Sequence, residues 1–265
     1  MKLAISNIGW SVDDDTAIYN KMINYGFEGL EIAPTRVFPK NPYDRLNEAN
    51  EWAEELKAEY RFDVPSMQSI WHGRTEKLFG TEEERQALVD YTKKAINFAA
   101  VINCKNLVFG CPKNRNLPED ANRKIAIEFF REIGNYAVGK GTVIGMEANP
   151  PIYNTNFIND TQSAIKLIEE VASDGFKLNL DMGTIIENDE DISVLKGYED
   201  LINHVHISEP GLKPIIKRKI HSKLADLLEA FSYKGYVSIE VACQEDIGEL
   251  DRMMKYVKEI FGEKK

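Results

Sequence analysis

The sequence is poor in the features that mark secreted, membrane-inserted and nucleic-acid-binding proteins. Its three cysteines, Cys104, Cys111 and Cys243, are odd in number and form no CxxC pair, which fits a reducing compartment better than a disulfide framework. No stretch reaches the roughly 18 apolar residues that a membrane-spanning helix needs, and the N-terminus turns acidic before any long apolar run. The formal net charge of −10 provides no long-range attraction for a phosphate backbone. We therefore expect a cytoplasmic protein that binds neither nucleic acid nor a membrane.

Linkers, low-complexity segments and near-identical repeats are also lacking. A chain of 265 residues with 43% hydrophobic residues can bury one full core. Because α/β barrels of this length are commonly one domain, we expect residues 1–265 to form a single domain. The sequence leaves the oligomeric state open, and a homo-oligomer is compatible with it.

Short runs rich in β-forming residues alternate with longer amphipathic runs along the whole chain, eight of each. The helical runs, such as 81–103 and 160–173, repeat apolar residues at three- and four-residue intervals and begin at threonine or aspartate, which are common N-caps. The β-forming runs are hydrophobic without alternation, which indicates strands buried on both faces in a parallel sheet wrapped by helices. These runs are 2–10, 29–34, 63–71, 106–112, 142–150, 176–184, 204–210 and 236–242.

Eight such units predict an α/β fold, a (β/α)8 TIM barrel with its active site at the C-terminal mouth. A doubly wound open sheet is the alternative. That fold usually has a glycine-rich first turn, and the corresponding stretch here, "SNIGWSVDD", is not glycine-rich.

Polar side chains end several of the predicted strands, at the edge where the loops of a barrel build its active site. Glu147, Asp181, His206 and Glu240 come from four successive strands. Three carboxylates and one imidazole on one ring predict a site for one divalent metal, with His206 as the only nitrogen ligand. This donor set suits Mn, Mg, Co or Zn, and the sequence does not distinguish among them.

Two other interpretations of these residues remain open. Buried carboxylates need a compensating charge, and Lys177 and Arg115 are available as ion-pair partners instead of a metal. His204 lies two residues before His206, so the two side chains point to the same side of the strand, with His204 one layer deeper. We expect His204 to be a hydrogen-bonded core histidine rather than a ligand.

Other residues near the strand ends are expected to bind a substrate. Trp71 and His72 suit packing against a sugar-like ligand and hydrogen bonding to it, although a histidine that caps its own loop fits as well. Lys113 and Arg115 suit a phosphate or carboxylate group, with a solvated loop as the alternative. The full expected set is Trp10, Glu31, Gln68, Trp71, His72, Phe109, Lys113, Arg115 and Asn149.

The four strand-end motifs "GMEANP", "LDMGT", "HVHISEP" and "GYVSIE" together resemble those of the sugar phosphate isomerase/epimerase family of xylose isomerase-like barrels. That family includes the ketose 3-epimerases and, more remotely, the apurinic endonucleases. "GLEIAPTR" and "VFGCPKNR" also fit, so the resemblance covers nearly the whole chain. Each motif alone is weak, and their order and spacing make the resemblance specific. In the family, the corresponding residues bind one divalent metal, and the motifs place them at Glu147, Asp181, His206 and Glu240.

The resemblance implies a metal-dependent isomerase or epimerase that acts on a sugar, a sugar phosphate or a sugar acid. Moving a proton from a carbon next to a carbonyl requires a base, an acid and stabilisation of the charge that develops on oxygen. Glu147 and Glu240 are expected to be the base and the acid as well as metal ligands. Asp181 and His206 would hold the metal.

Two positions depart from the ketose 3-epimerase pattern. Those enzymes usually have a histidine shortly after the strand-six aspartate, and an arginine several residues past the strand-seven histidine. This chain has Thr184 and Leu212 there. A sugar- or metal-binding barrel without turnover is therefore one alternative function. An apurinic endonuclease-like phosphodiesterase is the other, although four histidines and a net charge of −10 count against it.

Overall fold

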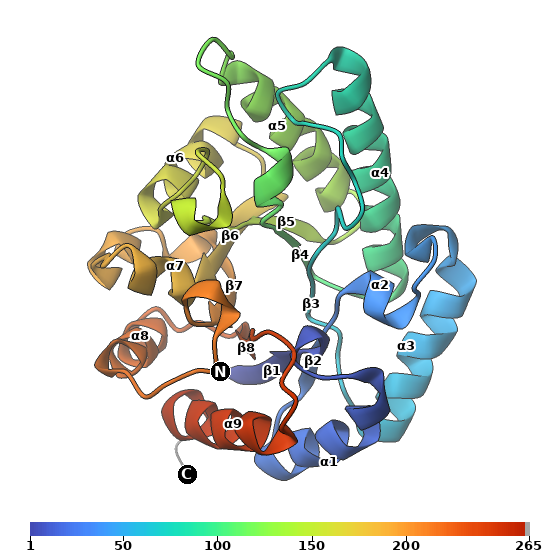
Figure 1. Cartoon of the computed structure of the whole chain (residues 1–265), viewed down its shortest axis with the longest axis vertical. Helices are drawn as coiled ribbons and strands as arrows, with labels where there is room; N and C mark the ends of the chain where they lie inside the picture. The colour runs from blue at the N-terminus through green and yellow to red at the C-terminus, as the bar shows by residue number, and fades with distance from the viewer. Residues whose placement is uncertain (263–265) are drawn as a thin grey trace.

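The computed structural model describes residues 1–262 and confirms the (β/α)8 barrel. Its eight parallel strands follow one another in the order β2-β1-β8-β7-β6-β5-β4-β3, and isolated bridges from Gly29 to Asp63 and from Ile32 to Met67 join β2 to β3 (Figure 1). Because these bridges connect β2 and β3, the two end strands of that order, the sheet closes, and the open-sheet alternative is wrong. The strands are β1 (Lys2–Ser6), β2 (Gly29–Glu31), β3 (Ser66–Met67), β4 (Asn106–Phe109), β5 (Val143–Met146), β6 (Phe176–Asp181), β7 (Ile202–Ile207) and β8 (Tyr236–Ile239).

Helices surround the barrel on its outside (Figure 1). The predicted caps are confirmed at α4 and α6, where Thr81 and Asp160 each accept a hydrogen bond from the third helical N–H in a capping box. No helix within residues 1–262 has the length and apolar character needed to cross a bilayer. The helices are α1 (Asp15–Tyr25), α2 (Pro34–Val37), α3 (Leu46–Tyr60), α4 (Glu82–Val101), α5 (Lys124–Val138), α6 (Thr161–Val171), α7 (Met182–Glu187), α8 (Lys219–Ala230) and α9 (Ile247–Phe261).

The strands are shorter than the β-forming runs of the sequence. The run 63–71 contributes only the two residues of β3, because the backbone of Ser69 turns into the left-handed region with φ of 55°. Every run continues past the end of its strand at the C-terminal mouth, into a loop or, after β6, into the start of α7. This geometry places the polar ends of the predicted strands in the mouth itself.

Aromatic packing fixes the strands that carry the polar ends. Phe130 on α5 stacks on Phe176 of β6 with ring centroids 4.7 Å apart, and its edge meets Phe109 of β4 at 4.8 Å. All three side chains are fully buried. Aromatic pairs at these separations contribute about 0.5–1.5 kcal/mol beyond the area they bury. The helix layer thus anchors β4 and β6 on both sides of β5.

A buried histidine in the outer layer makes stability depend on pH. His221 of α8 has no exposed surface, its Nδ1 lies 3.0 Å from the Tyr256 hydroxyl, and its Nε2 has no hydrogen-bond partner within residues 1–262. Burial lowers the pKa of His221 to about 4. A lowered folded-state pKa means that its contribution is present above the unfolded pKa and is lost as the pH falls from about 6.5 towards 4. The full shift corresponds to about 3 kcal/mol.

We expect His221→Gln to weaken this acid destabilisation. Without a titrating ring, the loss of melting temperature between pH 6.5 and pH 4.5 should be smaller in the variant than in the wild-type protein. Differential scanning calorimetry at the two pH values measures the difference. Equal losses in the two proteins would show that His221 is not the group responsible.

Candidate metal centre

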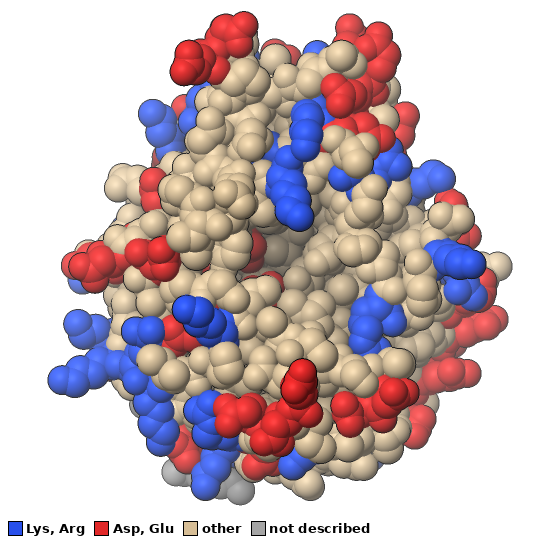
Figure 2. All heavy atoms as spheres, in the orientation of Figure 1, with Lys and Arg blue, Asp and Glu red and all other residues tan. Residues whose placement is uncertain are grey.

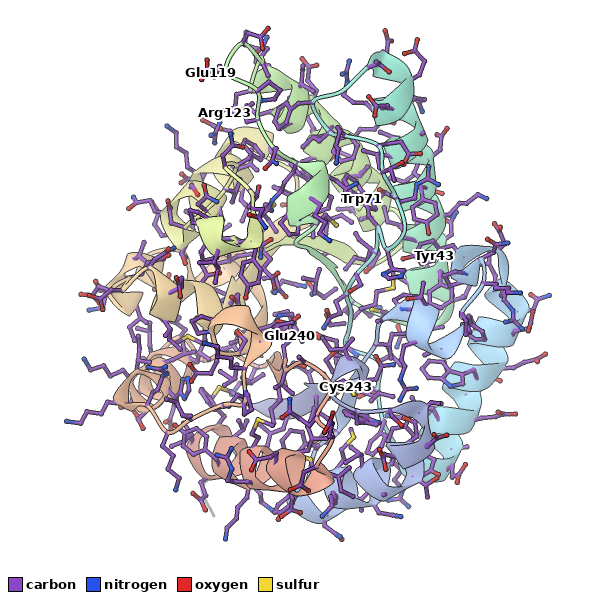
Figure 3. The ribbon with its side chains drawn as sticks, viewed as in Figure 1. Tyr43, Trp71, Glu119, Arg123, Glu240 and Cys243 are labelled. Atoms are coloured by element: carbon purple, nitrogen blue, oxygen red, sulfur yellow. The ribbon has the colours of Figure 1, made fainter. Side chains whose placement is uncertain are left out.

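The four strand-end residues expected to bind a metal converge in the barrel mouth. One ligand atom from each of Glu147, Asp181, His206 and Glu240 lies within 4.8 Å of the other three. His206 has no exposed surface, whereas the three carboxylates retain 7–8% exposure. Figure 3 places Glu240 inside the ring of strands, and Figure 2 shows a hollow at the centre of this face with acidic atoms at its bottom. The cluster is therefore buried but reachable from the mouth.

Strand register explains this convergence. Asp181 pairs with His206 across β6 and β7, and His206 pairs with Ser238 across β7 and β8, so Glu240 lies two residues further towards the mouth and, by alternation, on the same face. The backbone N–H of Glu147 donates to the Phe109 carbonyl at 3.1 Å, which extends the ladder between β4 and β5 by one residue. Parallel strands in register thus bring the four side chains to one edge of the sheet.

Hydrogen bonds hold Asp181 on both of its oxygens. Oδ1 accepts from the Ser208 hydroxyl, and Oδ2 accepts from the Thr184 backbone N–H at 2.7 Å. The second bond also caps α7. The Thr184 hydroxyl lies 2.7 Å from the Ala148 carbonyl and 2.9 Å from Oδ2 of Asp181, so it links β6 to the loop after β5.

Two asparagine amides orient the Glu147 carboxylate. Asn179 on β6 donates to Oε1 at 2.9 Å, and Asn149 donates to Oε2 at 3.1 Å. Gly110 leaves room for this carboxylate, because a Cβ there would lie 2.9 Å from Oε2. The Glu240 carboxylate, by contrast, contacts only His206 among the hydrogen bonds and ion pairs of residues 1–262, with its Oε2 3.3 Å from Nδ1. Glu147 is therefore held firmly, and Glu240 is held by one neighbour.

The two ring nitrogens of His206 face different groups. Nδ1 lies 3.0 Å from Oε1 of Glu147 and 3.3 Å from Oε2 of Glu240. Nε2 lies 2.9 Å from Oε2 of Glu31 on β2. The same Glu31 oxygen lies 2.9 Å from Nε2 of His204, which agrees with the expectation of a hydrogen-bonded core histidine.

Burial and charge shift the pKa values within the cluster. Burial, followed by repulsion from Glu147 and Asp181, raises the pKa of Glu240 to about 7, although His206 opposes the shift. Burial also raises the pKa of Asp181. Burial alone would lower the pKa of His206, but Glu31 and Glu240 outweigh it and raise that pKa well above its usual value. The cluster therefore carries more negative charge than one imidazole can balance.

These residues fit a divalent cation. Within residues 1–262, no lysine or arginine lies within ion-pair distance of the three carboxylates, and His206 is the ion-pair partner of two of them, Glu147 and Glu240. Lys177 makes no ion pair with them, and the Arg115 guanidinium donates to the Glu147 backbone carbonyl at 2.9 Å rather than to its carboxylate. Three carboxylates and one imidazole without a basic partner are a donor set typical of Mn, Mg, Co or Zn sites.

The sequence matches a family whose description agrees with this geometry. A profile of xylose isomerase-like TIM barrels matches residues 20–260. The chain belongs to the xylose isomerase-like TIM barrel family. No curated protein matches the sequence.

Solved structures share the whole fold of this xylose isomerase-like barrel. The 3-keto-D-glucoside 4-epimerase from E. coli is 21% identical, with a TM-score of 0.77 over 97% of this chain and 98% of that one. D-Psicose 3-epimerase from Clostridium cellulolyticum H10 is 16% identical, with a TM-score of 0.78 over 98% and 99% of the two chains. AP endonuclease family 2 from Brucella melitensis is 19% identical, with a TM-score of 0.74 over 98% and 99%. At these identities the likeness establishes the fold.

Three of the aromatic residues expected to bind substrate lie in the core of this xylose isomerase-like barrel. Trp10 is 2% exposed and Trp71 is 3% exposed, and their indole N–H groups donate to Asp15 and Thr92 at 2.8 Å. Phe109 is fully buried, 4.6 Å from the Trp71 ring. The two indole N–H groups therefore already have protein partners, and all three side chains are packed in the core.

Four of the expected polar contacts form a layer around the carboxylates. Arg115 has no exposed surface and also donates to Asn149 at 2.9 Å, while Gln68 donates to Glu31 at 3.1 Å. Arg115 and Asn149 thereby fix the loop that carries Glu147. Lys113, in contrast, is exposed beyond β4.

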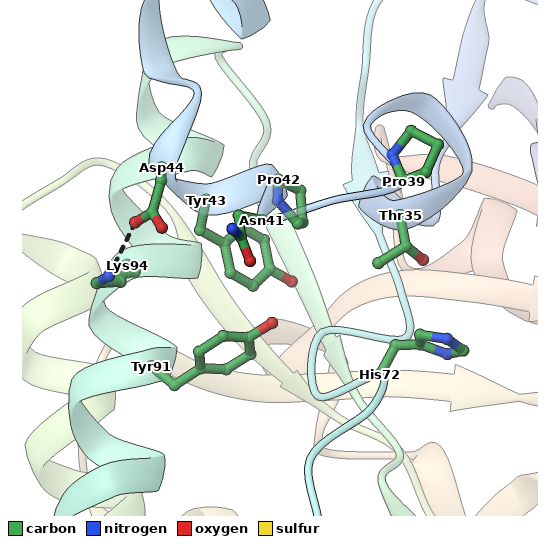
Figure 4. A pocket seen from close by; sticks show the side chains of 9 residues that line it. All are labelled: Thr35, Pro39, Asn41, Pro42, Tyr43, Asp44, His72, Tyr91 and Lys94. Atoms are coloured by element: carbon green, nitrogen blue, oxygen red, sulfur yellow. Dashed lines mark hydrogen bonds and ion pairs between the residues drawn. The ribbon is translucent and has the colours of Figure 1, made fainter.

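His72 lies on the rim, apart from the four clustered ligands. It is exposed and lines a cavity of about 190 Å³ together with Thr35, Asn41, Tyr43 and Tyr91. Figure 4 shows the His72 ring on the opposite side of this cavity from the ion pair of Asp44 and Lys94. The structure therefore assigns His72 to the surface between the segment after α2 and helix α4.

The sequence interpretation assigned no role in the site to three residues that the structure places in or near the mouth. Asn179 and Ser208 stand two residues before Asp181 and two after His206, and strand alternation could have placed them on the same side. Tyr153, in the loop after β5, accepts a hydrogen bond from the Gly211 N–H of the loop after β7 at 2.9 Å. Nothing in the sequence pattern indicates this bridge, because it joins two irregular loops.

Proposed function

We propose that the chain is a metal-dependent isomerase or epimerase of a sugar, sugar phosphate or sugar acid. The observation that carries this proposal is the convergence of three carboxylates and one imidazole, with no lysine or arginine of residues 1–262 paired to the carboxylates, in the mouth of a xylose isomerase-like barrel. Two of the similar structures are named as sugar epimerases, acting on 3-keto-D-glucoside and on D-psicose. Their shared fold supports a carbohydrate as the substrate class.

Glu147, Asp181, His206 and Glu240 would hold the cation. When bound, a divalent cation supplies positive charge that stabilises the negative charge developing on substrate oxygens during proton removal. Both oxygens of Asp181 accept hydrogen bonds, from Ser208 and from the Thr184 N–H, which fix its carboxylate in a position suited to holding the cation.

Glu147 and Glu240 are the groups suited to moving the proton. They follow β5 and β8, which β6 and β7 separate, so their carboxylates approach the centre from different sides. Among the ion pairs of residues 1–262 the Glu240 carboxylate has only His206 as a partner, so its oxygens are not taken up by several donors and can exchange a proton. The asparagine amides that hold Glu147 keep its carboxylate oriented, which favours its role as the base.

Removal and return of the metal test this proposal. We expect chelator-treated protein to be inactive on a panel of ketoses, ketose phosphates, keto-glycosides and sugar acids, and Mn, Mg, Co or Zn to restore the interconversion of one of them. Product analysis by chromatography measures the conversion. Metal binding without turnover of any panel member would favour the binding-only barrel. Cleavage of abasic DNA by the metal-loaded protein would favour the phosphodiesterase.

A further inference from the structure

We infer that Glu31 is a positioning residue of the metal centre. Its carboxylate accepts a hydrogen bond from Nε2 of His206, which leaves Nδ1 as the ring nitrogen that faces Glu147 and Glu240. The inference rests on the metal site of the proposed function and adds a role for a residue outside the four ligands.

The geometry of the His206 ring carries the first step. An imidazole binds a metal through a nitrogen without a proton, and the hydrogen bond made by the other nitrogen decides which one that is. The carboxylate of Glu31 lies 2.9 Å from Nε2 and can only accept when ionised. When only one ring proton remains, as in a metal-bound imidazole, it therefore resides on Nε2. Nδ1, 3.0 Å from Glu147, is left for the cation.

The surroundings of Glu31 carry the second step. Its side chain is fully buried, and within residues 1–262 its ion-pair partners are His204 and His206, with no lysine or arginine. Gln68 donates to Oε1 at 3.1 Å and also lies 2.8 Å from the Ser6 hydroxyl. Donors from β7 and from the segment after β3 thus fix both oxygens of Glu31. A buried charge held from two sides can orient its neighbour with little freedom.

Glu31 contacts His206 from a strand that is not a neighbour of β7 in the sheet. It ends β2, and β1 and β8 lie between that strand and β7 in the sheet. Its carboxylate therefore reaches His206 across the inside of the barrel, below the mouth. From this position Glu31 can orient the ring of His206, although it is not one of the four residues expected to hold the cation.

A second metal bound by Glu31, His204 and His206 is the competing interpretation, because their ligand atoms also lie within 4.8 Å of one another. That ion would need Nε2 of His206, while the first needs Nδ1 of the same ring. The three donors around Glu31, from Gln68, His204 and His206, already satisfy its oxygens. The geometry therefore favours one metal and one orienting carboxylate.

The first experiment is metal affinity of Glu31→Gln, measured by calorimetry with Mn and with Zn. An amide has one accepting oxygen for three donors and no charge, so we expect the affinity to fall about 10–100-fold, the range usual for such outer partners of a ligand. Glu209→Gln is the matched control, since Glu209 is a buried carboxylate paired with Arg218. The metal affinity of Glu209→Gln should stay within about twofold of that of the wild type, far less than the loss expected for an outer partner of a ligand.

The second experiment measures how many metal ions bind per chain, in the wild type and in His204→Gln. One ion per chain in both the wild type and the variant supports the inference. Two ions in the wild type and one in the variant would establish the second metal instead. A wild type that binds no metal overturns the proposed function, whereas a wild type that binds and a folded Glu31→Gln that binds equally well overturns the role of Glu31 alone.

The third experiment requires no variant. In Zn-loaded wild-type protein labelled with ¹⁵N, the His206 resonances should show a protonated Nε2 and a metal-bound Nδ1. A protonated Nδ1, or zinc on Nε2, contradicts the inference even if Glu31→Gln fails to fold. This readout reports directly which ring nitrogen of His206 carries the proton. A purely structural role for Glu31 would not determine that.

Discussion

Glu240→Gln is expected to lose turnover even when the metal site is saturated. Glutamine keeps the size of the side chain and one ligand oxygen but cannot take a proton. General acid–base groups contribute about 10²–10⁴-fold to rate, so the variant should stay at least about 100-fold slower than the wild type. Its Oε2 lies 3.3 Å from Nδ1 of His206, so metal affinity should also fall, but excess metal overcomes that part.

Turnover of the variant should be measured at increasing metal concentration until it reaches a plateau. Asp63→Asn is a suitable control, because it removes a carboxylate at the other end of the barrel, where Asp63 pairs with Lys57. The control should retain wild-type turnover. If metal-saturated Glu240→Gln turns over within tenfold of the wild-type rate, the loss is smaller than a general acid–base group usually contributes. Glu240 would then not take part in the proton transfer.

Asp181→Asn is expected to lose metal binding with little loss of fold. Asparagine can still cap α7 through the Thr184 N–H, so the stability cost is small. The substitution replaces one negatively charged ligand by a neutral amide, so less negative charge remains to balance the cation. Because losing a hydrogen-bond partner of a ligand already lowers metal affinity about 10–100-fold, losing a ligand itself should lower it at least about 100-fold.

A matched change elsewhere in the chain separates capping from metal binding. Asp160 caps α6 through the Ser163 N–H at 2.7 Å, which is the same local role. Asp160→Asn should therefore lose a similar amount of stability and keep its metal affinity. Calorimetric titration of both variants gives the comparison. Wild-type affinity in Asp181→Asn would show that Asp181 is not a ligand.

The strand-end residues could be predicted because two simple regularities determine them. Parallel strands run into the mouth, and the residue that follows each strand projects there. Glu147 and Glu240 occupy such positions, Asp181 ends β6 and His206 is the next-to-last residue of β7, and the structure brings the ligand atoms of all four together as predicted. Their roles as ligands and as base and acid remain predictions.

The second layer could not be predicted, because it depends on distances across the barrel. Nothing local in "GLEIAP" shows that Glu31 reaches His206 past two intervening strands. Arg115 was expected to face a ligand, yet its loop folds inward and its donors meet the Glu147 carbonyl and Asn149. Trp10 and Trp71 lie at strand ends but are buried, because irregular loops and not strand alternation decide their direction.

Deuterium exchange by the wild-type protein tests the central claim most directly. The protein is stripped of metal, divided, and one half is reloaded with Mn or Mg before incubation in D2O with a panel of ketoses and their phosphates. The metal-loaded half should incorporate deuterium at the carbon next to the carbonyl of at least one sugar, as read by proton NMR, and the stripped half should not. Full metal loading with no exchange in any sugar, or equal exchange in both halves, would contradict a metal-dependent proton transfer.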